Sequence, residues 1–317
     1  MLILHIGTQK TGSSSIQHFL RENEGRLREQ GINFVSAVRN WIDHNNLARE
    51  LRGGDLKRPR LKEVLQEIES QPDRLHIISA EELFHEKVPN VLSEHMPKHL
   101  IQNTRVVVYL RRPDKLAEAL YKQRIKAGRI KPGPKKFINE WEWEWDYLPV
   151  LKEYSNLFGF DSISARPYER TMLESNDIVC DFLKVTEIPD SNAYVRTKPE
   201  DNPTFSNAVS ELMGFCALNL DVKFFDLNER IARLNWPDIR RNGDVFTKLE
   251  RLEIMDRYRR NLDKIAEDYS EDLRECFICD DLQDESQISY PNSDEQARLY
   301  RQAGRAVVYA LKGIGKI

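Results

Sequence analysis

Short apolar runs alternate with amphipathic segments over the first two thirds of the chain. Five of these runs have the length and composition of buried strands, and a polar or glycine-containing turn follows most of them. They cover residues 2–6, 32–35, 75–78, 105–110 and 162–165. Segments with helical spacing of apolar residues separate them, among them 13–30, 43–51, 61–68 and 89–96. Because this alternation favours a parallel sheet with crossover helices, we expect an α/β fold: a doubly wound parallel sheet of about four or five strands.

The pattern changes after about residue 200, where the strand signal disappears. Helical spacing continues at 204–218, 224–234, 246–277 and 293–311. We therefore predict an α/β core over residues 1–200. A helical C-terminal part over 201–317 is expected to pack on the same core and not to fold independently.

The last of these helices is amphipathic, with Val307 and Leu311 on an apolar side and Arg301 and Arg305 among its basic residues. A helix of this kind can lie on a membrane surface or on a partner. More often it packs its apolar side on its own domain, and that is the prediction here.

The turn after the first strand has the composition of a phosphate-binding loop. Its sequence is Gly7-Thr8-Gln9-Lys10-Thr11-Gly12-Ser13-Ser14-Ser15, and it opens a helix. Backbone N–H groups and the helix dipole attract an anion there, a lysine adds a full charge, and glycine allows close approach. The alternative is an ordinary strand-to-helix turn in which Ser13 only caps the helix.

The order of residues in this loop distinguishes two classes of nucleotide site. The nucleoside-triphosphate loop places its lysine after the last glycine, whereas Lys10 precedes Gly12 by two positions. This arrangement resembles the 5′-phosphosulfate loop of sulfotransferases that use 3′-phosphoadenosine 5′-phosphosulfate (PAPS), which have a P-loop-like fold. The resemblance implies that PAPS is the cofactor. It also implies that PAPS is bound by these residues of the loop: Gly7, Gln9, Lys10, Thr11, Gly12, Ser13, Ser14 and Ser15.

The clearest strand, 105–110, runs directly into Arg111 and a further helix. This is similar to the 3′-phosphate site of the same family, where an arginine and a serine eight positions later bind the phosphate. Arg111 fits that pattern, and a guanidinium can bind a phosphate bidentately. Position 119 is alanine, so the serine hydroxyl is missing. A run of nearby cations either compensates for this loss or forms a solvated basic surface: Lys122, Arg124, Lys126, Arg129, Lys131, Lys135 and Lys136.

The segment from Arg166 to Glu169 follows the last strand and is similar to the family segment near adenine and ribose. Tyr168 either stacks on the base or is a half-buried strand-end tyrosine. Weaker similarities to bacterial sulfotransferases occur at 181–183, 202–206 and 257–262.

Sulfuryl transfer needs a positive group at the leaving oxygen and a base for the acceptor proton. The resemblance gives the first role to Lys10. It gives the base role to Glu81, because the third strand end supplies the base in related enzymes. His44 is the alternative base, since imidazole titrates near neutral pH. For each residue the alternative to a catalytic role is a structural one: Glu81 would be a charge at a helix start, and His44 an exposed residue that opens a helix.

The acceptor is expected to be a hydroxyl, or an amine, of a carbohydrate or another small metabolite. Trp141, Trp143 and Trp145 lie in the sequence WEWEWD and can stack on sugar rings. The alternative, slightly favoured, is that two of the three are core residues.

Composition excludes several other classes of protein. The 317 residues are 40% hydrophobic and 31% charged with a net charge of −3, which is ordinary for a soluble enzyme and argues against nucleic-acid binding. No apolar run approaches the roughly 20 residues that span a bilayer, and Met1 leads straight into the first strand, so we expect a cytoplasmic protein. Cys276 and Cys279 form a C-x-x-C pair without further ligands nearby, so we predict a structural role for them and no metal site.

Two further hypotheses stay open. A nucleotide kinase or phosphotransferase would use a similar loop, but its lysine is misplaced here and a magnesium-binding aspartate after an apolar strand is missing. A catalytically inactive nucleotide-binding scaffold is the other, and Ala119 motivates it.

Overall fold

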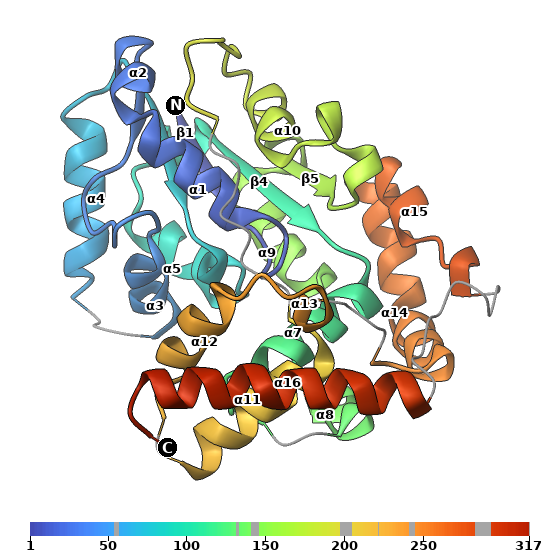
Figure 1. Ribbon diagram of the computed structural model, residues 1–317. Helices are drawn as coiled ribbons and strands as arrows, with labels where there is room; N and C mark the ends of the chain where they lie inside the picture. Colours follow the sequence, from blue (N-terminus) through green and yellow to red (C-terminus); the bar gives the residue numbers. More distant parts are fainter. Residues whose placement is uncertain are drawn as a thin grey trace. The chain divides into compact units, whose positions relative to one another are not determined.

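The structure is a computed structural model (Figure 1), and it describes residues 1–53, 57–130, 133–140, 146–196, 205–220, 222–240, 245–282 and 293–316. The chain divides into two compact units. We call the first the sheet unit; it comprises Met1–Arg112, Asp146–Thr197 and Tyr258–Ile278. We call the second the helical unit; it comprises Pro113–Trp145, Lys198–Arg257 and Cys279–Ile317. The proposed division at residue 200 stays a prediction about which segments fold as a domain.

The sheet unit is built on five parallel strands, in the spatial order β2-β3-β1-β4-β5. The strands are β1 (Leu2–His5), β2 (Ile32–Phe34), β3 (Leu75–Ser79), β4 (Thr104–Leu110) and β5 (Ile163–Pro167). All five correspond to apolar runs in the sequence, because strands buried on both faces need continuous apolar character. The predicted α/β fold class is confirmed.

One face of the sheet is covered by α1 (Ser13–Glu22), α2 (Glu24–Glu29) and α10 (Ile178–Val185) (Figure 1). Their apolar sides pack with Ile3, Ile77 and Val107 from three central strands. Residues 13–30 form two helices and not the single predicted one. The break lies at Asn23, whose side-chain amide donates to the carbonyls of Phe19 and Val195 at 2.9 and 3.0 Å.

Helices α3 (Asn45–Gly53), α4 (Pro59–Glu69), α5 (Lys87–His95), α6 (Lys98–Gln102) and α9 (Leu148–Phe158) complete the main helices of this unit. Leu2, Leu4 and Ile78 from the strands face α3 and α4 around a small, wholly apolar cavity. Helix α9 packs on β4, β5 and α5. The sheet is therefore doubly wound, and its carboxyl edge is where a ligand is expected.

Shorter elements complete the sheet unit. They are the 3₁₀ turns η1 (Glu81–Leu83), η3 (Phe160–Ser162), η4 (Arg170–Met172) and η5 (Glu174–Asn176), and helix α15 (Asp272–Phe277). Cys276 is buried near the end of α15, and among the described residues neither it nor Cys279 forms a disulfide. Within the described residues no cluster of three or more His, Cys, Asp or Glu side chains could hold a metal ion.

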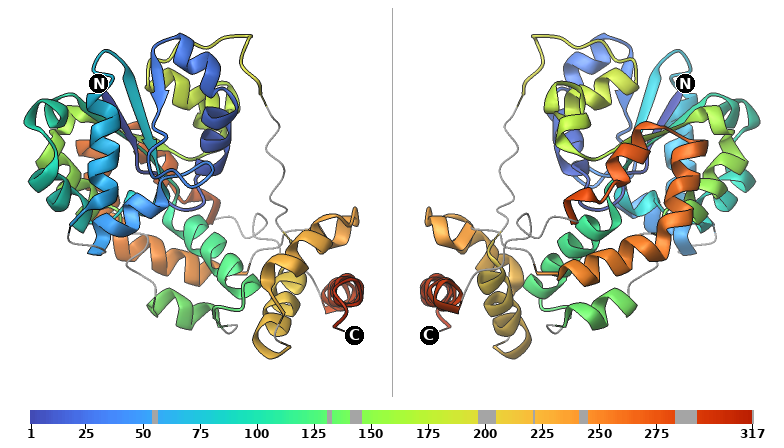
Figure 2. Two further views of the ribbon diagram at one scale, coloured as in Figure 1. Left: turned by 90° about the vertical axis from the view of Figure 1, so that its left-hand side faces the viewer. Right: turned by 90° about the vertical axis from the view of Figure 1, so that its right-hand side faces the viewer.

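The helical unit contains α7 (Pro113–Lys126), α8 (Pro134–Glu140), α11 (Asn207–Asn219), α12 (Phe224–Ala232), α13 (Pro237–Arg240), the 3₁₀ turn η6 (Asp280–Leu282) and α16 (Ser293–Gly313). The long helix α14 (Lys248–Asp268) has residues in both units. Helices α11, α12 and α16 pack together around a shared apolar core (Figure 2).

Helix α16 buries its apolar side in that core, with Val307 and Leu311 at most 5% exposed. Packing of the last helix on its own chain, as predicted, accounts for its amphipathic pattern. No helix among the described residues is long and apolar enough to cross a membrane.

Candidate functional site

The loop between β1 and α1 has an unusual backbone. Lys10 (φ 63°) and Gly12 (φ 78°) both lie in the left-handed region, which costs a residue with a Cβ about 1–2 kcal/mol. Two hydroxyls fix the loop: Thr8 donates to the carbonyl of Tyr109 on β4 at 3.0 Å, and Thr11 donates to the carbonyl of Thr8 at 2.6 Å. Turns of this kind expose successive N–H groups that can bind an anion.

Two glycines of the loop are required by space. A Cβ on Gly7 would lie 2.5 Å from Ser13 Oγ, and one on Gly12 would lie 3.1 Å from the Tyr168 ring and from Ile178. Real Cβ atoms essentially never approach another atom to 2.5 Å, and 3.1 Å is closer than most real Cβ contacts. Gly7 and Gly12 therefore have steric reasons to be glycine, and at Gly12 the positive φ adds a conformational one.

Beneath the loop lie two buried polar atoms without a partner. Ser13 Oγ and His5 Nε2 have no hydrogen bond within the described part of the chain, although their residues are only 4% and 1% exposed. Ser13 does not cap α1, and no other side chain among the described residues does so. Since buried polar groups are normally satisfied, the unpartnered hydroxyl and the uncapped helix start fit a bound anion better than a simple turn.

Lys10, Glu81 and Arg111 come together at this edge. Lys10 keeps solvent-accessible surface, but the protein around it partly desolvates its ammonium, and this burial lowers its pKa. The Arg111 charge lowers it further, while the Glu81 carboxylate opposes the shift. Arg111 Nη1 also donates to the Lys10 carbonyl at 3.4 Å. A desolvated cation beside a second one is a setting in which an anion binds strongly.

Glu81 begins η1 directly after β3 and is half-buried. Its Oε2 receives hydrogen bonds from Gln17 Nε2 at 3.5 Å and from Asn45 Nδ2 at 3.4 Å. Gln17 also donates to Ser79 Oγ at 3.2 Å, and Ser79 Oγ lies 2.7 Å from His5 Nδ1. The carboxylate is thus positioned by side chains from α1 and α3.

His44, the alternative base, is fully buried. Its Nε2 lies 2.9 Å from the carbonyl oxygen of Val35, and its Nδ1 receives the backbone N–H of Ser79 at 3.2 Å. Burial lowers its pKa to about 4, so the ring is neutral at physiological pH. The predicted exposed helix-start histidine is wrong: both ring nitrogens hold the chain between β2 and β3.

Arg111 and Tyr168 lie together at the ends of β4 and β5. The Arg111 guanidinium is 5.9 Å from the centre of the Tyr168 ring, and the Tyr147 hydroxyl donates to the Arg111 carbonyl at 2.7 Å. Tyr168 is half-exposed and also borders Gly12. The structure therefore brings Arg111, Tyr168 and the loop to one place.

Arg166, unlike Arg111, has its guanidinium bound by two carboxylates. Its Nε and Nη2 contact the two oxygens of buried Asp181 at 3.2 and 2.9 Å, and Nη1 contacts Asp272 at 3.2 Å. The Asp181 carboxylate raises the pKa of Arg166 and itself accepts from the Tyr109 hydroxyl at 2.9 Å. A nucleotide would have to compete with this ion pair, so a contact from Arg166 stays a prediction.

Ala119 lies on α7 in the helical unit, and several cations near it already have partners. Lys122 pairs with Glu118 at 2.6 Å. Arg124 is buried and lies 5.5 Å from the Phe137 ring, and Lys126 lies 5.1 Å from the Phe205 ring. Lys131 and the tryptophans at 141, 143 and 145 fall outside the described residues.

Sequence reasoning missed the residues that orient the site. Gln17, Asn45 and Ser79 act through contacts 36 to 64 positions apart. One weak signal in the sequence could have identified two of them. Gln17 and Ser79 are polar residues on a helix face and in a strand that are otherwise apolar.

Comparison with known proteins gives limited similarity. No protein-family model matches the chain. An uncharacterised protein of Archaeoglobus fulgidus is 27% identical over 175 residues, which are 53% of this chain and 46% of that protein, so the match spans less than half of the relative. A crystal structure of a sulfotransferase from Alicyclobacillus acidocaldarius is similar with a TM-score of 0.40 and 14% identity, over 69% of this chain and 92% of that one.

Proposed function

We propose that this protein transfers a sulfuryl group from PAPS to a hydroxyl of a carbohydrate or another small metabolite. The observation that carries the proposal is the β1–α1 loop. Its lysine precedes the last glycine, and the loop stands over the buried, unpartnered hydroxyl of Ser13. A loop of this order resembles that of PAPS-dependent sulfotransferases.

The residues present fit the donor at its 5′ end. The loop N–H groups of Thr11 and Gly12, the uncapped start of α1 and the Ser13 hydroxyl would hold the 5′-phosphate. Arg111 would hold the 3′-phosphate, and Tyr168 would face the adenine. When bound, PAPS supplies a sulfuryl group that passes to the acceptor oxygen as its bond to the 5′-phosphate oxygen breaks and the electron pair stays on the phosphate.

Two side chains then carry the chemistry. The Lys10 ammonium offsets the negative charge that develops at the leaving oxygen, and preorganised positive charge of this kind is commonly the largest catalytic term. Glu81 accepts the proton that the acceptor hydroxyl loses. We assign this role to Glu81 and not to His44, because both nitrogens of His44 contact the backbone.

Calorimetric titration with 3′-phosphoadenosine 5′-phosphate (PAP), beside ATP with magnesium, tests the proposal. We expect binding of PAP and little of ATP with magnesium. The Arg111→Ala variant should lose affinity for PAP far more than for 5′-AMP, because the lost guanidinium meets only the 3′-phosphate.

Three other results would count against the proposal. Tight binding of ATP with magnesium and none of PAP would favour a kinase. Binding of PAP without turnover on any hydroxyl acceptor would favour an inactive scaffold. No binding of either nucleotide would mean that the loss of a serine at Ala119 is not compensated.

A further inference from the structure

The segment between β2 and α3, residues 36–44, ends in the same region as the proposed site; we call it the β2 loop. It carries an exposed tryptophan: Trp41 is 70% exposed, whereas the next residue, Ile42, is 8% exposed. Single exposed apolar residues are common on protein surfaces. Exposure alone therefore assigns no role to Trp41.

The backbone of the β2 loop is what sets Trp41 apart. Val38 (φ 62°) and Trp41 (φ 56°) both lie in the left-handed region. For bulky or β-branched residues this conformation is an outlier that costs about 1–3 kcal/mol and persists only where the surroundings enforce it. At Trp41 the enforcing element is a turn closed by backbone hydrogen bonds: the Asn40 N–H donates to the Asp43 carbonyl and the Ile42 N–H to the Asn40 carbonyl, both at 2.7 Å. This turn presents the indole to solvent.

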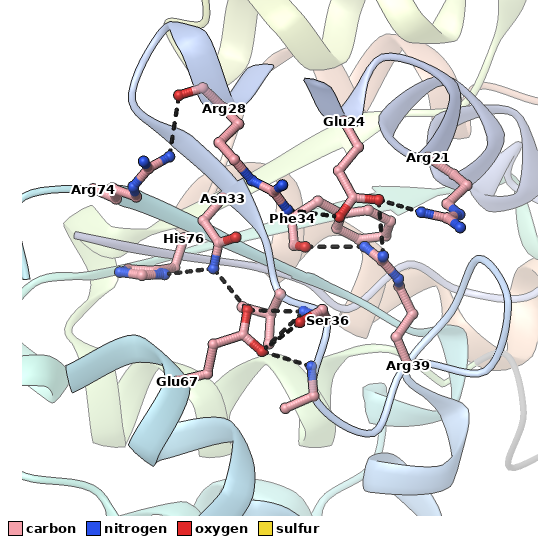
Figure 3. Close-up of polar contacts among 12 residues, drawn as sticks. Arg21, Glu24, Arg28, Asn33, Phe34, Ser36, Arg39, Glu67, Arg74 and His76 are labelled. Carbon is pink, nitrogen blue, oxygen red and sulfur yellow. Dashed lines mark hydrogen bonds and ion pairs between the residues drawn. The ribbon is translucent and has the colours of Figure 1, made fainter. Parts of the chain in front are cut away.

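Contacts from helix α4 hold the backbone at the start of the β2 loop (Figure 3). The Glu67 carboxylate on α4 accepts the backbone N–H groups of Ser36 and Ala37, the Ser36 hydroxyl and the Asn33 amide, at 2.6 to 3.1 Å. Burial alone would raise the pKa of Glu67, but these hydrogen bonds outweigh it and lower the pKa. The carboxylate is thus a fixed anchor for the loop.

A second anchor is Arg39 (Figure 3). Its guanidinium donates to the Phe34 carbonyl at 2.9 Å, pairs with Glu24 at 2.9 Å, and lies 4.4 Å from the centre of the Phe34 ring. At the other end of the loop, buried His44 is bound to the backbone of Val35, directly after β2, and of Ser79 in β3. The loop is held on both sides of Trp41.

Trp41 contacts helix α1, which also carries part of the proposed site. The His18 ring on α1 meets the indole edge-on, with ring centres 5.0 Å apart and planes at 85°. His18 follows Gln17, which contacts Glu81, and Asn45 contacts Glu81 four residues after Trp41. The same two elements, α1 and the β2 loop with the start of α3, therefore carry both the indole and the contacts to the proposed base.

We propose that Trp41 is the platform on which the acceptor binds, and that the acceptor is a neutral sugar ring. This inference rests on the proposed function. A pyranose presents an apolar C–H face that stacks on an indole and a rim of hydroxyls that need hydrogen-bond partners. Asn40 precedes Trp41 directly and Asn46 follows it by five positions, so their amides are candidate partners for such a rim, while Glu81 would take the proton of the hydroxyl that is sulfated.

The test is NMR of protein labelled with ¹⁵N-tryptophan, with and without PAP. The chain has five tryptophans, and the indole signal missing from Trp41→Phe is that of Trp41. Three probes are titrated to about 100 mM, where weak binding is visible: methyl β-D-glucopyranoside, methyl β-D-galactopyranoside and methyl α-D-mannopyranoside. We expect at least one of them to shift the Trp41 signal. Trp41→Ala should weaken binding of that sugar about tenfold or more, with PAP affinity unchanged.

Phe160→Ala is the matched control, because Phe160 is 51% exposed but precedes β5, at the opposite edge of the sheet. It should change neither sugar nor PAP binding. An unshifted Trp41 signal with all three sugars would overturn the inference, as would unchanged sugar binding by Trp41→Ala. p-Nitrophenol is titrated in the same way, and a shift with it alone would also overturn the inference, in favour of a phenolic acceptor. Failure of PAP to bind would count against the proposed function only, because the sugar titration is read without PAP as well.

Discussion

The loops that follow β1 and β2 both hold residues in the left-handed conformation, but by different means. The β1 loop combines glycine at one of its two left-handed positions and a Thr11–Thr8 hydrogen bond inside the turn with one distant contact, from Thr8 to Tyr109. The β2 loop has no glycine, and it combines a local turn at residues 40–43 with contacts to Glu67 and Glu24 from other helices. The glycines of the first loop leave a motif in the sequence, whereas the distant anchors of the second do not.

Lys10→Ala should produce the largest effect, on the chemical function of the β1 loop. Transfer is expected to fall about a hundredfold to a thousandfold, since one group that stabilises developing charge is worth that much. Stability should hardly change, because alanine meets the same backbone strain as lysine. Turnover and thermal unfolding would be measured beside Lys98→Ala, an exposed control on α6. Near-normal turnover would remove Lys10 from the reaction.

Acidification should destabilise both loops through two buried histidines. Burial lowers the pKa of His5, below the β1 loop, to about 3, and that of His44, which ends the β2 loop, to about 4. In the unfolded chain both titrate near 6.5, so between about pH 6.5 and 4 the unfolded state binds more protons. Each histidine should then cost about 2 kcal/mol of unfolding free energy at pH 5 relative to pH 7.

Denaturant unfolding at pH 7, 6 and 5 measures this loss. The carboxylates of Glu67 and Asp181, whose pKa values are lowered, act in the same direction but mainly below about pH 5, where the unfolded carboxyl groups bind protons. A His44→Asn variant should be less stable at pH 7 but lose less on acidification. A stability that is flat over this range would show that the two rings are not buried as neutral groups.

Glu67→Gln should have the smallest effect, and one confined to the β2 loop. The substitution replaces one carboxylate oxygen, which accepts backbone N–H groups, by an NH₂ group that donates and so leaves those N–H groups without an acceptor. This should cost about 1–3 kcal/mol of stability. Sugar binding at Trp41 should weaken, with PAP binding kept. The control is Glu63→Gln, an exposed residue of the same helix, which should leave both unchanged. Equal loss of PAP binding would mean that the two loops are not independently anchored.

The sequence alone determined the sheet and the β1 loop. Continuous apolar runs identify buried parallel strands because both of their faces must leave water. The glycines, lysine and serines of Gly7 to Ser15 lie within nine positions, so their chemistry is visible without a fold. Glu81 and Arg111 were proposed from the resemblance to sulfotransferases and because they follow parallel strands, whose carboxyl ends meet at one edge of the sheet. Their roles stay predictions.

Only the tertiary structure decided which candidate site residues already have structural partners. Arg166 is bound by Asp181 and Asp272, His44 is buried between β2 and β3, and the loop that carries the exposed Trp41 is anchored at Ala37 by Glu67, 30 positions away on α4. Burial and ion pairing depend on which distant side chain arrives at a given place. That is set by packing of the whole unit and not by local pattern, so residue type alone could not separate a free functional group from a structural one.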